Sequence, residues 1–374
     1  VSPYGRPLAL ASNDSSESEV LPRRPPLEIL YSDQTVQTAS RTLQYRKRVP
    51  DQVTVITREE FENWPARDLD EVLGLVNGIV VRNDGLLGQN ATAQIQGSKA
   101  QEVRVLVDGI PFNPTSTGGI ADLSQIPLDI VEKIEIIKGA SSSVWGSALG
   151  GVINIITKPV GRKTLPTAEG TFSWGEFGIQ QNHGEVSGKA GDAGYYVFGS
   201  KAKAEGFRPN SKEFEDRAFL KGELPVGETV KTHASFGYSG SENGEFEFPL
   251  SNSHFRRKVY SRYGSAGLQW DPSDTWHHEA AYKISERRFR RDFRLLPNAD
   301  LFRYTKARSF VQEVSTQSVW NLTENQTIVA GADVGVELLQ SAIFQFLTTN
   351  GTTLSEVGKS NTRQGYFTNY QLTW

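Results

Sequence analysis

The sequence predicts a small α+β domain followed by a transmembrane antiparallel β-barrel. Helix and strand patterns are mixed up to about residue 160, whereas from residue 165 apolar and polar residues alternate with period two. Connections in this second part alternate between short turns and long polar segments. Outer-membrane barrels show both features, because each strand has one face on lipid and one on the wet lumen.

Composition agrees with a membrane protein built from strands. Hydrophobic residues make up only 37% of the 374 residues and no long apolar run occurs, so we expect no transmembrane helix. In strands where apolar and polar residues alternate, high and low hydropathies cancel, which fits the mean hydropathy of −0.43. The net charge of −3 is too close to neutral to indicate a nucleic-acid partner. Because cysteine is absent, disulfides and thiolate metal sites are excluded.

The chain begins with a segment that has no folding pattern. Residues 1–32 are rich in Ser, Pro, Glu and Arg and lack apolar periodicity. Such a segment buries too little apolar surface to offset the entropy lost on ordering it. We therefore predict a disordered leader over residues 1–32.

The first elements of the α+β domain are a strand and two short helices. The β-branched run at 53–57 predicts a strand, and Thr57 with Glu60 forms a capping box that opens a helix. The apolar positions over 69–76 recur at helical spacing and predict a second helix face. Asn77-Gly78 ends that helix, since both residues tolerate the left-handed conformation.

The later elements of this domain are strands. Valines at alternate positions over 103–107 lead into Asp108-Gly109, which is a strong two-residue hairpin signal. Residues 131–139 and 150–157 predict two further strands. A domain of this length with this many elements is of ordinary size.

Period-two alternation assigns the faces of the barrel strands. In residues 230–238 and 327–338, apolar residues occupy one face and polar residues the other. We expect Ala332 to face lipid. The aromatic residues expected on the same lipid face are Phe236, Tyr238, Trp320 and Trp374. The polar residues expected on the lumen face are Lys231, His233, Asp333 and Glu337.

The lengths of the connections indicate which strand ends are periplasmic, with short turns, and which are extracellular, with long loops. Short turns are expected at 191–194, 225–228, 271–274 and 323–326, and long polar segments near 206–213, 241–258, 287–303 and 341–361. The soluble alternative is a β-sandwich or propeller. Strands of a sandwich have about 5–6 residues, whereas these reach the roughly 9–11 residues that a tilted membrane strand needs. We count about ten strands by this pattern.

Several collinear segments resemble one family. They read DQTVQTASR at 33–41, LDEVLGLVNGIVVR at 69–82, VLVDGIPFN at 105–113, ADLSQIPLDIVEKIEIIKG at 121–139 and SVWGSALGGVINIITK at 143–158. In order and spacing they resemble the TonB box and plug domain of TonB-dependent outer-membrane receptors, including the cobalamin and siderophore receptors. The resemblance implies a TonB box at 33–41, a plug domain at 42–160 and a partial barrel at 165–374, in the bacterial outer membrane.

The resemblance also implies a plug enclosed by a barrel of about 22 strands. Ten strands cannot enclose a domain of this size, because even an eight-stranded barrel is filled by its own side chains. We therefore expect the chain to be the N-terminal portion of a receptor. The strand near Ala168 and the strand at 362–374 should then pair with strands that are missing.

The segment at 33–39 is the candidate for contact with the TonB energy-coupling protein. Strand addition suits such a contact, because an extended peptide gives main-chain hydrogen bonds to a sheet edge. An upstream disordered leader would keep the segment available. The alternative is a plain edge strand. The residues of the candidate TonB box are Asp33, Gln34, Thr35, Val36, Gln37, Thr38 and Ala39.

Two loops between plug strands are candidates for facing the substrate. Both are rich in small polar residues, which give adaptable hydrogen bonding; the alternative is ordinary polar turns. The candidates are Asn83, Asp84 and Gln89 in the first loop, and Asn113, Thr115, Ser116 and Thr117 in the second. Candidates for plug-to-barrel ion pairs, or alternatively for simple solvation, are Arg104, Glu132, Glu135 and Lys138.

Residues 286–294, ERRFRRDFR, form a basic segment predicted to be extracellular. Such a segment would attract an anionic ferric siderophore or a lipopolysaccharide phosphate. The alternative is a solvated strand end with arginines at the headgroup level. The five basic residues are Arg287, Arg288, Arg290, Arg291 and Arg294.

No catalytic motif is present, so we expect neither an enzyme nor a bound cofactor or metal. The resemblance implies a receptor that imports a ferric siderophore or cobalamin, driven by the inner-membrane proton gradient. Its expected partners are the TonB energy-coupling protein, a small metal chelate and outer-membrane lipid, with no nucleic acid. The alternative is a surface adhesin or signalling receptor on the same scaffold.

Overall fold

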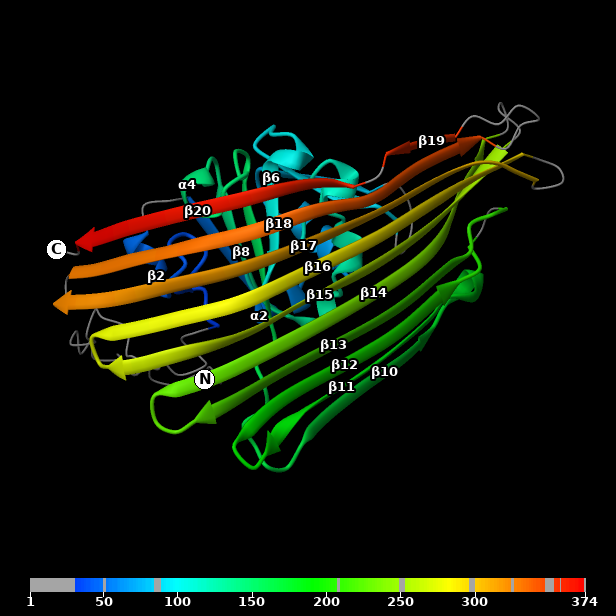
Figure 1. The fold of residues 1–374 in the computed structure, drawn as a ribbon. Coiled ribbons are helices and arrows are strands. Elements are labelled where there is room, and N and C mark those ends of the chain that lie inside the picture. Colours follow the sequence, from blue (N-terminus) through cyan, green and yellow to red (C-terminus); the bar gives the residue numbers. More distant parts are fainter. Residues whose placement is uncertain are drawn as a thin grey trace, which may run out of the picture.

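The fold is described from a computed structural model. It covers residues 31–49, 52–83, 89–206, 209–248, 253–295, 300–323, 326–346, 353–356 and 358–372. Most of the predicted leader, residues 1–30, lies outside the described residues. A small α+β domain lies against one face of a large tilted wall of antiparallel strands (Figure 1). This is the predicted fold class: a plug domain and part of a transmembrane antiparallel barrel.

The plug domain is organised by a five-stranded sheet in the order β3-β8-β9-β6-β7. Its strands are β3 (Val53–Thr57), β6 (Val103–Val107), β7 (Ile110–Pro111), β8 (Val131–Lys138) and β9 (Gly151–Thr157). Only β6 and β9 run parallel among its strand pairs. Strands β6 and β9 are buried at every position, which explains their continuous apolar runs rather than an alternation.

Short helices and two small strand pairs complete the plug domain. The α-helices are α2 (Arg58–Glu62), α3 (Leu69–Gly74) and α4 (Ser142–Trp145), and the strand pairs are β1 (Thr35–Val36) with β2 (Gln44–Tyr45) and β4 (Ile79–Asn83) with β5 (Ala91–Ile95). The 3₁₀ helices are η1 (Arg46–Arg48), η2 (Ala100–Glu102), η3 (Thr115–Thr117), η4 (Leu123–Gln125), η5 (Leu128–Ile130) and η6 (Glu176–Gly178). None of the described helices is long and apolar enough to cross a membrane.

The local signals read from the sequence are confirmed. The Glu60 carboxylate accepts a hydrogen bond from the Thr57 N–H at 2.8 Å and so caps α2. At the turn between β6 and β7, Asp108 and Gly109 both have positive φ, 47° and 72°. Two positive φ angles are what a tight two-residue hairpin turn requires.

The wall is an 11-stranded antiparallel sheet. Its strands are β10 (Thr167–Trp174), β11 (Gln180–Ala190), β12 (Ala193–Ala204), β13 (Glu213–Val226), β14 (Val230–Phe248), β15 (Ser253–Ser273), β16 (Trp276–Leu295), β17 (Asp300–Thr323), β18 (Gln326–Phe346), β19 (Thr353–Glu356) and β20 (Lys359–Leu372). Neighbours in sequence pair along the wall, except that β20 pairs with β18 beyond the short β19. Among the described residues β10 and β20 do not pair with each other, so the sheet is open.

The wall strands are longer than the sequence pattern predicted. Strands β14 to β18 have 19 to 24 residues. The segments 241–258 and 287–303, predicted as long polar loops, are therefore mostly strand. The reason is that alternation of apolar with polar residues is required only where one face meets lipid. Beyond that band both faces are polar, and the period-two signal fades although strand pairing continues.

The predicted lumen face is confirmed by contacts with the plug side. Asp333 forms an ion pair with Arg41 of the N-terminal segment, with Nη1 and Oδ2 2.5 Å apart. Glu337 accepts a hydrogen bond from Thr115 Oγ1 at 3.2 Å. His233 lines a cavity that residues of the plug domain share. Lys231 and His233 are two positions apart on β14, so their side chains point to the same face of the wall.

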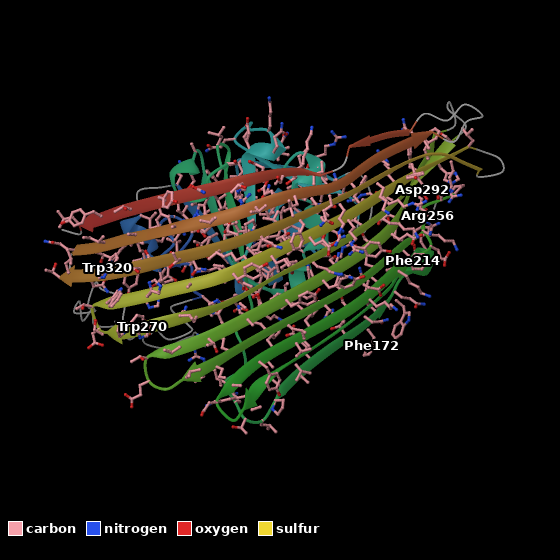
Figure 2. All side chains as sticks on the ribbon, viewed as in Figure 1. Phe172, Phe214, Arg256, Trp270, Asp292 and Trp320 are labelled. Carbon is pink, nitrogen blue, oxygen red and sulfur yellow. The ribbon has the colours of Figure 1, made fainter. Side chains whose placement is uncertain are left out.

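The predicted lipid face is confirmed by exposure. Phe236 is 44% exposed and Trp320 is 36% exposed, and both point away from the plug. Figure 2 shows Trp320 and Trp270 near the same end of the wall. Ala332 adjoins the lumen-facing Asp333 and so lies on the outward face, as its register predicts. Trp374, which we also expected on this face, lies outside the described residues.

The apolar core of the plug continues into the wall. Its buried cluster contains Ile134 and Ile153 of the plug sheet together with Phe219 and Tyr263 of the wall. The ring of Phe112 packs edge-on against Tyr263, with the ring centroids 5.3 Å apart. Burial of this shared surface holds the plug on the inner face of the wall.

Candidate functional site

The candidate coupling segment, residues 33–39, is docked on the plug domain. Thr35 and Val36 form β1, which pairs with β2. Thr35, Val36 and Thr38 are at most 1% exposed, whereas Asp33 is exposed. The expectation of a freely available segment is therefore wrong for this conformation. A partner can pair with this strand only after the segment leaves its site.

A buried ion pair on β8 holds the segment. Glu135 Oε2 accepts hydrogen bonds from the N–H groups of Gln37 and Thr38, at 3.0 and 2.8 Å, and from Thr38 Oγ1 at 2.6 Å. Lys133 Nζ lies 3.0 Å from Glu135 Oε1 and donates to the Thr35 carbonyl at 2.9 Å. Lys133 and Glu135 are two positions apart on one strand and therefore share a face. Hydrogen bonds to ionised groups are the stronger class, so this contact is a firm clamp.

Two further plug side chains complete the clamp around Thr38. Trp145 Nε1 donates to the Thr38 carbonyl at 2.6 Å. Asn154 Nδ2 donates to Thr38 Oγ1 at 3.0 Å. The N–H, carbonyl and hydroxyl of Thr38 are thus all bonded to the plug, so Thr38 is the centre of the docked segment.

Arg41 joins the end of the segment to the wall. Besides its ion pair with Asp333, its guanidinium carbon lies 4.4 Å from the ring centroid of Trp145 and 4.5 Å from that of Phe367. Gln317 Nε2 donates to the Arg41 carbonyl at 3.0 Å. Guanidinium groups stack favourably on aromatic faces. The segment is therefore tied both to the plug and to the inner face of β17, β18 and β20.

The first predicted substrate-facing loop is only partly described. Asp84 lies outside the described residues. Asn83 Nδ2 donates to Asp70 Oδ2 at 2.7 Å within the plug. Gln89 is buried, and its Nε2 donates to Glu213 Oε1 and to the Gly244 carbonyl, both at 3.2 Å. Gln89 therefore joins this part of the plug to the wall.

The second predicted loop rests on the wall through η3. Ser116 Oγ lies 2.9 Å from Ser309 Oγ, and Thr117 Oγ1 donates to the Ile120 carbonyl at 2.7 Å. Asn113 is buried and bonds to the backbone of Val103, Val105 and Gly119. Asn113 thus shapes the loop, and Thr115 and Ser116 place it beside the lumen face. That this loop faces the substrate stays a prediction.

An ion triad that the sequence did not reveal anchors the plug to the wall. Asp122 Oδ2 accepts hydrogen bonds from Arg257 Nη2 and from Arg287 Nη2, the latter at 2.7 Å. All three side chains are at most 5% exposed. Burial alone raises the pKa of Asp122, but the two guanidinium groups together hold that pKa below its ordinary value. Asp122 is therefore ionised and joins the plug to β15 and β16.

Two lysines make further bridges between plug and wall. Lys158 Nζ lies 2.5 Å from Glu185 Oε1 of β11, and Lys221 Nζ of β13 lies 3.2 Å from Asp108 Oδ2. The plug is thus attached to the wall at several separate points. Movement of the plug requires these ion pairs to break or exchange.

The predicted plug-to-barrel candidates have different roles. Glu135 pairs within the plug, and Lys138 Nζ donates to the Asn77 carbonyl of the plug at 2.7 Å. Glu132 is half-buried on β8. Arg104 is buried, and burial lowers its pKa to about 10 despite the attraction of the wall carboxylates Glu313 and Glu337. Arg104 and Glu132 both interact electrostatically with wall carboxylates, Arg104 with Glu313 and Glu337, and Glu132 with Glu185.

The basic segment is strand, not loop, and its arginines divide between two faces. It lies in β16, where alternate side chains point to opposite faces. Arg287 points to the lumen and contacts Asp122, and Arg291 shares its parity. Arg288, Arg290 and Arg294 have the opposite parity and point outward. The expectation of a loop is therefore wrong and the alternative of a strand end holds, and alternate positions on the strand divide the five side chains between two faces.

The residues missed by sequence reasoning are those with distant partners. No local motif points to Arg41. The one local feature of Asp122 is that its side chain accepts a hydrogen bond from the Ser124 N–H at the start of η4. Parity along β15 and β16 would have placed Arg257 and Arg287 in the lumen. Their partner in the plug is not visible from the sequence.

Comparison with known proteins agrees with this geometry. The family model described as TonB-dependent Receptor Plug Domain matches residues 46–152. The chain is similar to Pseudomonas aeruginosa FpvA bound to a heterologous pyoverdine, with TM-score 0.74 and 14% identity over 93% of this chain and 53% of FpvA. It is also similar to a mutant ferric enterobactin receptor PfeA from Pseudomonas aeruginosa, with TM-score 0.59 and 18% identity over 90% of this chain and 60% of PfeA.

A third similar structure comes from another organism. The ferric yersiniabactin uptake receptor FyuA from Yersinia pestis matches with TM-score 0.51 and 13% identity, over 86% of this chain and 61% of FyuA. At these identities the structures share the fold. The chain spans between about half and three fifths of the length of these three proteins.

Proposed function

Because this chain belongs to the TonB-dependent receptors of the bacterial outer membrane, we propose that it imports a metal chelate across that membrane. The chelate binds above the plug, and the candidate TonB box at 33–39 leaves its site on the plug. The energy-coupling protein TonB then grips the freed segment and pulls on the plug. The inner-membrane proton gradient supplies the work.

The observation that carries this proposal is the docked segment itself. Thr35, Val36 and Thr38 are buried, and the segment is held by apolar packing of Val36 and Ala39 together with polar contacts that include those from Lys133 and Glu135. Once released, the same backbone groups are free to add as a strand to a partner sheet. A segment that is bound in one condition and exposed in another suits a gated coupling step.

For the chelate we propose a ferric siderophore. The similar structures include a ferric yersiniabactin uptake receptor, a ferric enterobactin receptor and a receptor bound to pyoverdine. Cobalamin is the second candidate on sequence resemblance, and the two differ in charge and size. The lumen presents hydroxyl groups from Thr115 and Ser116 together with carboxylates and guanidinium groups of the wall, which suits a polar chelate.

We expect cells that carry the receptor to accumulate radiolabelled iron supplied as at least one siderophore chelate. The physical reason is that a plugged receptor admits only a solute that both binds and triggers coupling. Uptake is measured in a receptor deletion strain complemented with this receptor, with a panel of iron siderophores and with radiolabelled cobalamin. Uptake of cobalamin without uptake of any siderophore would show that cobalamin, and not a ferric siderophore, is the substrate. Surface binding without any uptake would favour the alternative, a signalling receptor or adhesin.

The clamp predicts that Glu135→Gln exposes the coupling segment. The change removes the charge that receives three hydrogen bonds from Gln37 and Thr38 and that pairs with Lys133. Breaking a buried ion pair by removing one partner costs about 3–5 kcal/mol. The docked form therefore loses most of its free-energy advantage over the released form. Because the sequence contains no cysteine, a Val36→Cys probe gives a clean measure by maleimide labelling. We expect labelling at least tenfold faster in Glu135→Gln.

The controls for this experiment lie on the same elements. Gln34→Cys is exposed already and should label equally fast with and without Glu135→Gln. Glu132→Gln removes a carboxylate from the same strand without touching the segment, and should leave Val36→Cys protected. Equal protection of Val36→Cys in Glu135→Gln and Glu132→Gln would contradict the clamp.

A further inference from the structure

The outward face of the wall carries a dense group of cations toward the end opposite the short turn between β15 and β16. We call it the outer cationic patch. Its basic members are Arg256, Lys258 and Arg262 of β15, Arg288, Arg290 and Arg294 of β16, and Arg308 of β17. Three carboxylates lie among them, from Glu242, Glu286 and Asp292. Among the residues joined by these ion pairs, seven cations against three carboxylates leave four positive charges in excess.

Strand parity fixes the direction of these side chains. Arg257 and Arg287 reach the plug at Asp122, so they point to the lumen. Arg256 and Arg288 are their immediate neighbours along β15 and β16 and therefore point away from the lumen. Figure 2 shows Arg256 and Asp292 at the end of the wall opposite Trp270 and Trp320.

The spacing along β15 places the patch at the headgroup level of the membrane. Trp270 lies at the aromatic end of the outward face. Arg262 lies eight positions before Trp270 on β15 and pairs with Tyr238 of β14. Eight residues at about 3.4 Å per residue span about 27 Å along the strand. For a strand tilted by about 40° this is about 21 Å along the membrane normal, close to the roughly 25 Å apolar band of outer-membrane barrels.

The surface between these two levels is apolar, as a lipid-facing band requires. Outward residues there are 40–54% exposed and include Phe236, Leu268, Tyr282 and Val314. Tyrosine is typical of the membrane–water interface, because its ring is apolar and its hydroxyl is polar. Tyr238 and Tyr260 stand where the band gives way to the cations. The patch thus begins where lipid headgroups begin.

The carboxylates hold the guanidinium groups in place. Glu286 Oε1 accepts hydrogen bonds from Nε of Arg288 at 2.8 Å and from Nε of Arg308 at 2.6 Å. Within the described part of the chain the terminal nitrogens of these two arginines make no hydrogen bond, and their side chains are 48% and 39% exposed. Two neighbouring guanidinium groups fixed in this way are a preorganised site for a phosphate, which accepts bidentate hydrogen bonds from arginine.

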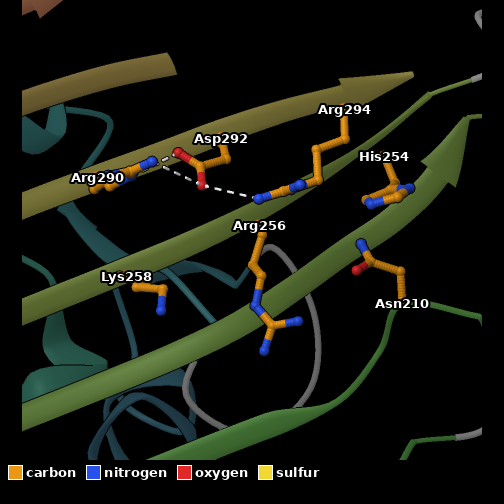
Figure 3. A pocket seen from close by; sticks show the side chains of 7 residues that line it. All are labelled: Asn210, His254, Arg256, Lys258, Arg290, Asp292 and Arg294. Atoms are coloured by element: carbon orange, nitrogen blue, oxygen red, sulfur yellow. Dashed lines mark hydrogen bonds and ion pairs between the residues drawn. The ribbon is translucent and has the colours of Figure 1, made fainter. Parts of the chain in front are cut away.

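Two hollows in the same face provide room for such groups. The larger has a volume of about 570 Å³ and is lined by His254, Arg256, Lys258, Arg290, Asp292, Arg294 and Asn210 (Figure 3). The smaller has a volume of about 200 Å³ and is lined by Tyr238, Tyr260, Arg262, Glu286 and Arg288. The smaller hollow combines apolar rings below with cations above.

We propose that the outer cationic patch binds the phosphate groups of an anionic lipid in the outer leaflet of the outer membrane. A chelate on its way through the lumen meets the opposite face of the wall, so the patch is separate from the transport path. The excess of four positive charges matches a lipid with more than one phosphate. The exposed apolar band directly below the patch accommodates the acyl chains of the same lipid.

Native mass spectrometry of the full-length receptor in detergent tests this proposal. The probes are bisphosphorylated lipid A, the same lipid A without phosphates, and inorganic phosphate. We expect retention of bisphosphorylated lipid A and about tenfold weaker binding in Arg288→Gln/Arg308→Gln, since charge-assisted hydrogen bonds are the strong ones. Arg288→Lys/Arg308→Lys keeps both charges and should bind at an intermediate level.

The matched control removes two outward cations elsewhere. Lys201 and Lys203 are exposed residues of β12 on the same face of the wall, and Lys201→Gln/Lys203→Gln should bind lipid A as the unmodified receptor does. Equal binding of phosphorylated and dephosphorylated lipid A would overturn the proposal, as would equal losses in the patch and control variants. Full displacement of the lipid by inorganic phosphate at matched concentration would show a site for free anions instead. The readout is lipid binding, so it is independent of the transported chelate.

Discussion

A receptor that lacks Asp33–Ala39 is expected to bind its chelate at the cell surface with unchanged affinity and to import none of it. Under the proposed function, the coupling protein then has no strand to grip, and we expect the proton gradient not to act on the plug. Uptake of radiolabelled chelate should fall to the level of a receptor deletion strain.

The separation of the two sites along the wall explains why binding survives. Arg41, at the end of the segment, contacts Asp333 and Gln317, whereas the loop of Thr115 and Ser116 contacts the wall at Glu337 and Ser309. Gln317 and Ser309 lie eight positions apart on β17. At about 3.4 Å per residue this is about 27 Å, while Asp333 and Glu337 lie four positions apart on β18, about 14 Å. Removing the segment therefore leaves the contacts of that loop in place.

The measurement compares surface binding with uptake in the same cells. A deletion of seven residues in the predicted leader, residues 12–18, is the matched control and should preserve both activities. If surface binding fell in parallel with uptake after deletion of 33–39, the segment would belong to the binding site and the coupling assignment would fail. If uptake persisted, another segment would carry the coupling.

Asp122→Asn is expected to destabilise the seating of the plug by about 3–5 kcal/mol, the usual cost of breaking a buried ion pair by removing one partner. The substitution keeps the shape of the side chain but removes its charge. Arg257 and Arg287 are both buried, and both then lose the carboxylate that their guanidinium groups share. The bonds from the N–H groups of Ala91 and Ser124 are left to a neutral and weaker acceptor.

Amide hydrogen exchange of the plug strands in the purified receptor measures this effect. We expect faster amide exchange in β5 and η4 of the Asp122→Asn receptor and unchanged exchange in the strands of the wall. Asp216→Asn is the control, because Asp216 pairs with Lys201 on the exposed face and such pairs contribute about 0–1 kcal/mol. Unchanged exchange in Asp122→Asn would show that the apolar contact between plug and wall holds the plug by itself.

The same anchor gives a pH dependence with a definite sign. The pKa of Asp122 is held below its ordinary value by the two guanidinium groups, against the effect of burial. Its contribution to stability is therefore fully present above the unfolded pKa of about 3.9. It is lost as the pH falls through the lower folded value. Protection of the plug by this anchor should be constant from neutral pH to about pH 4 and decline only below that.

The sequence by itself determined the local structure and the direction of side chains. The strand at 53–57, the capping box at Thr57 and Glu60, and the hairpin at Asp108-Gly109 all have the predicted form. Period two placed Asp333 in the lumen and Phe236 on the outside. These features depend on neighbours within a few residues, and so the chain reveals them without its fold.

The tertiary structure alone decided what the candidate sites touch. Thr38 and Glu135 are 97 residues apart, and Asp122 and Arg257 are 135 apart, so no local pattern joins them. The basic run at 286–294 looked like one surface until its strand conformation divided it between lumen and membrane. Contacts of this kind arise when the plug packs against the wall, because burial brings together charges that the chain keeps far apart.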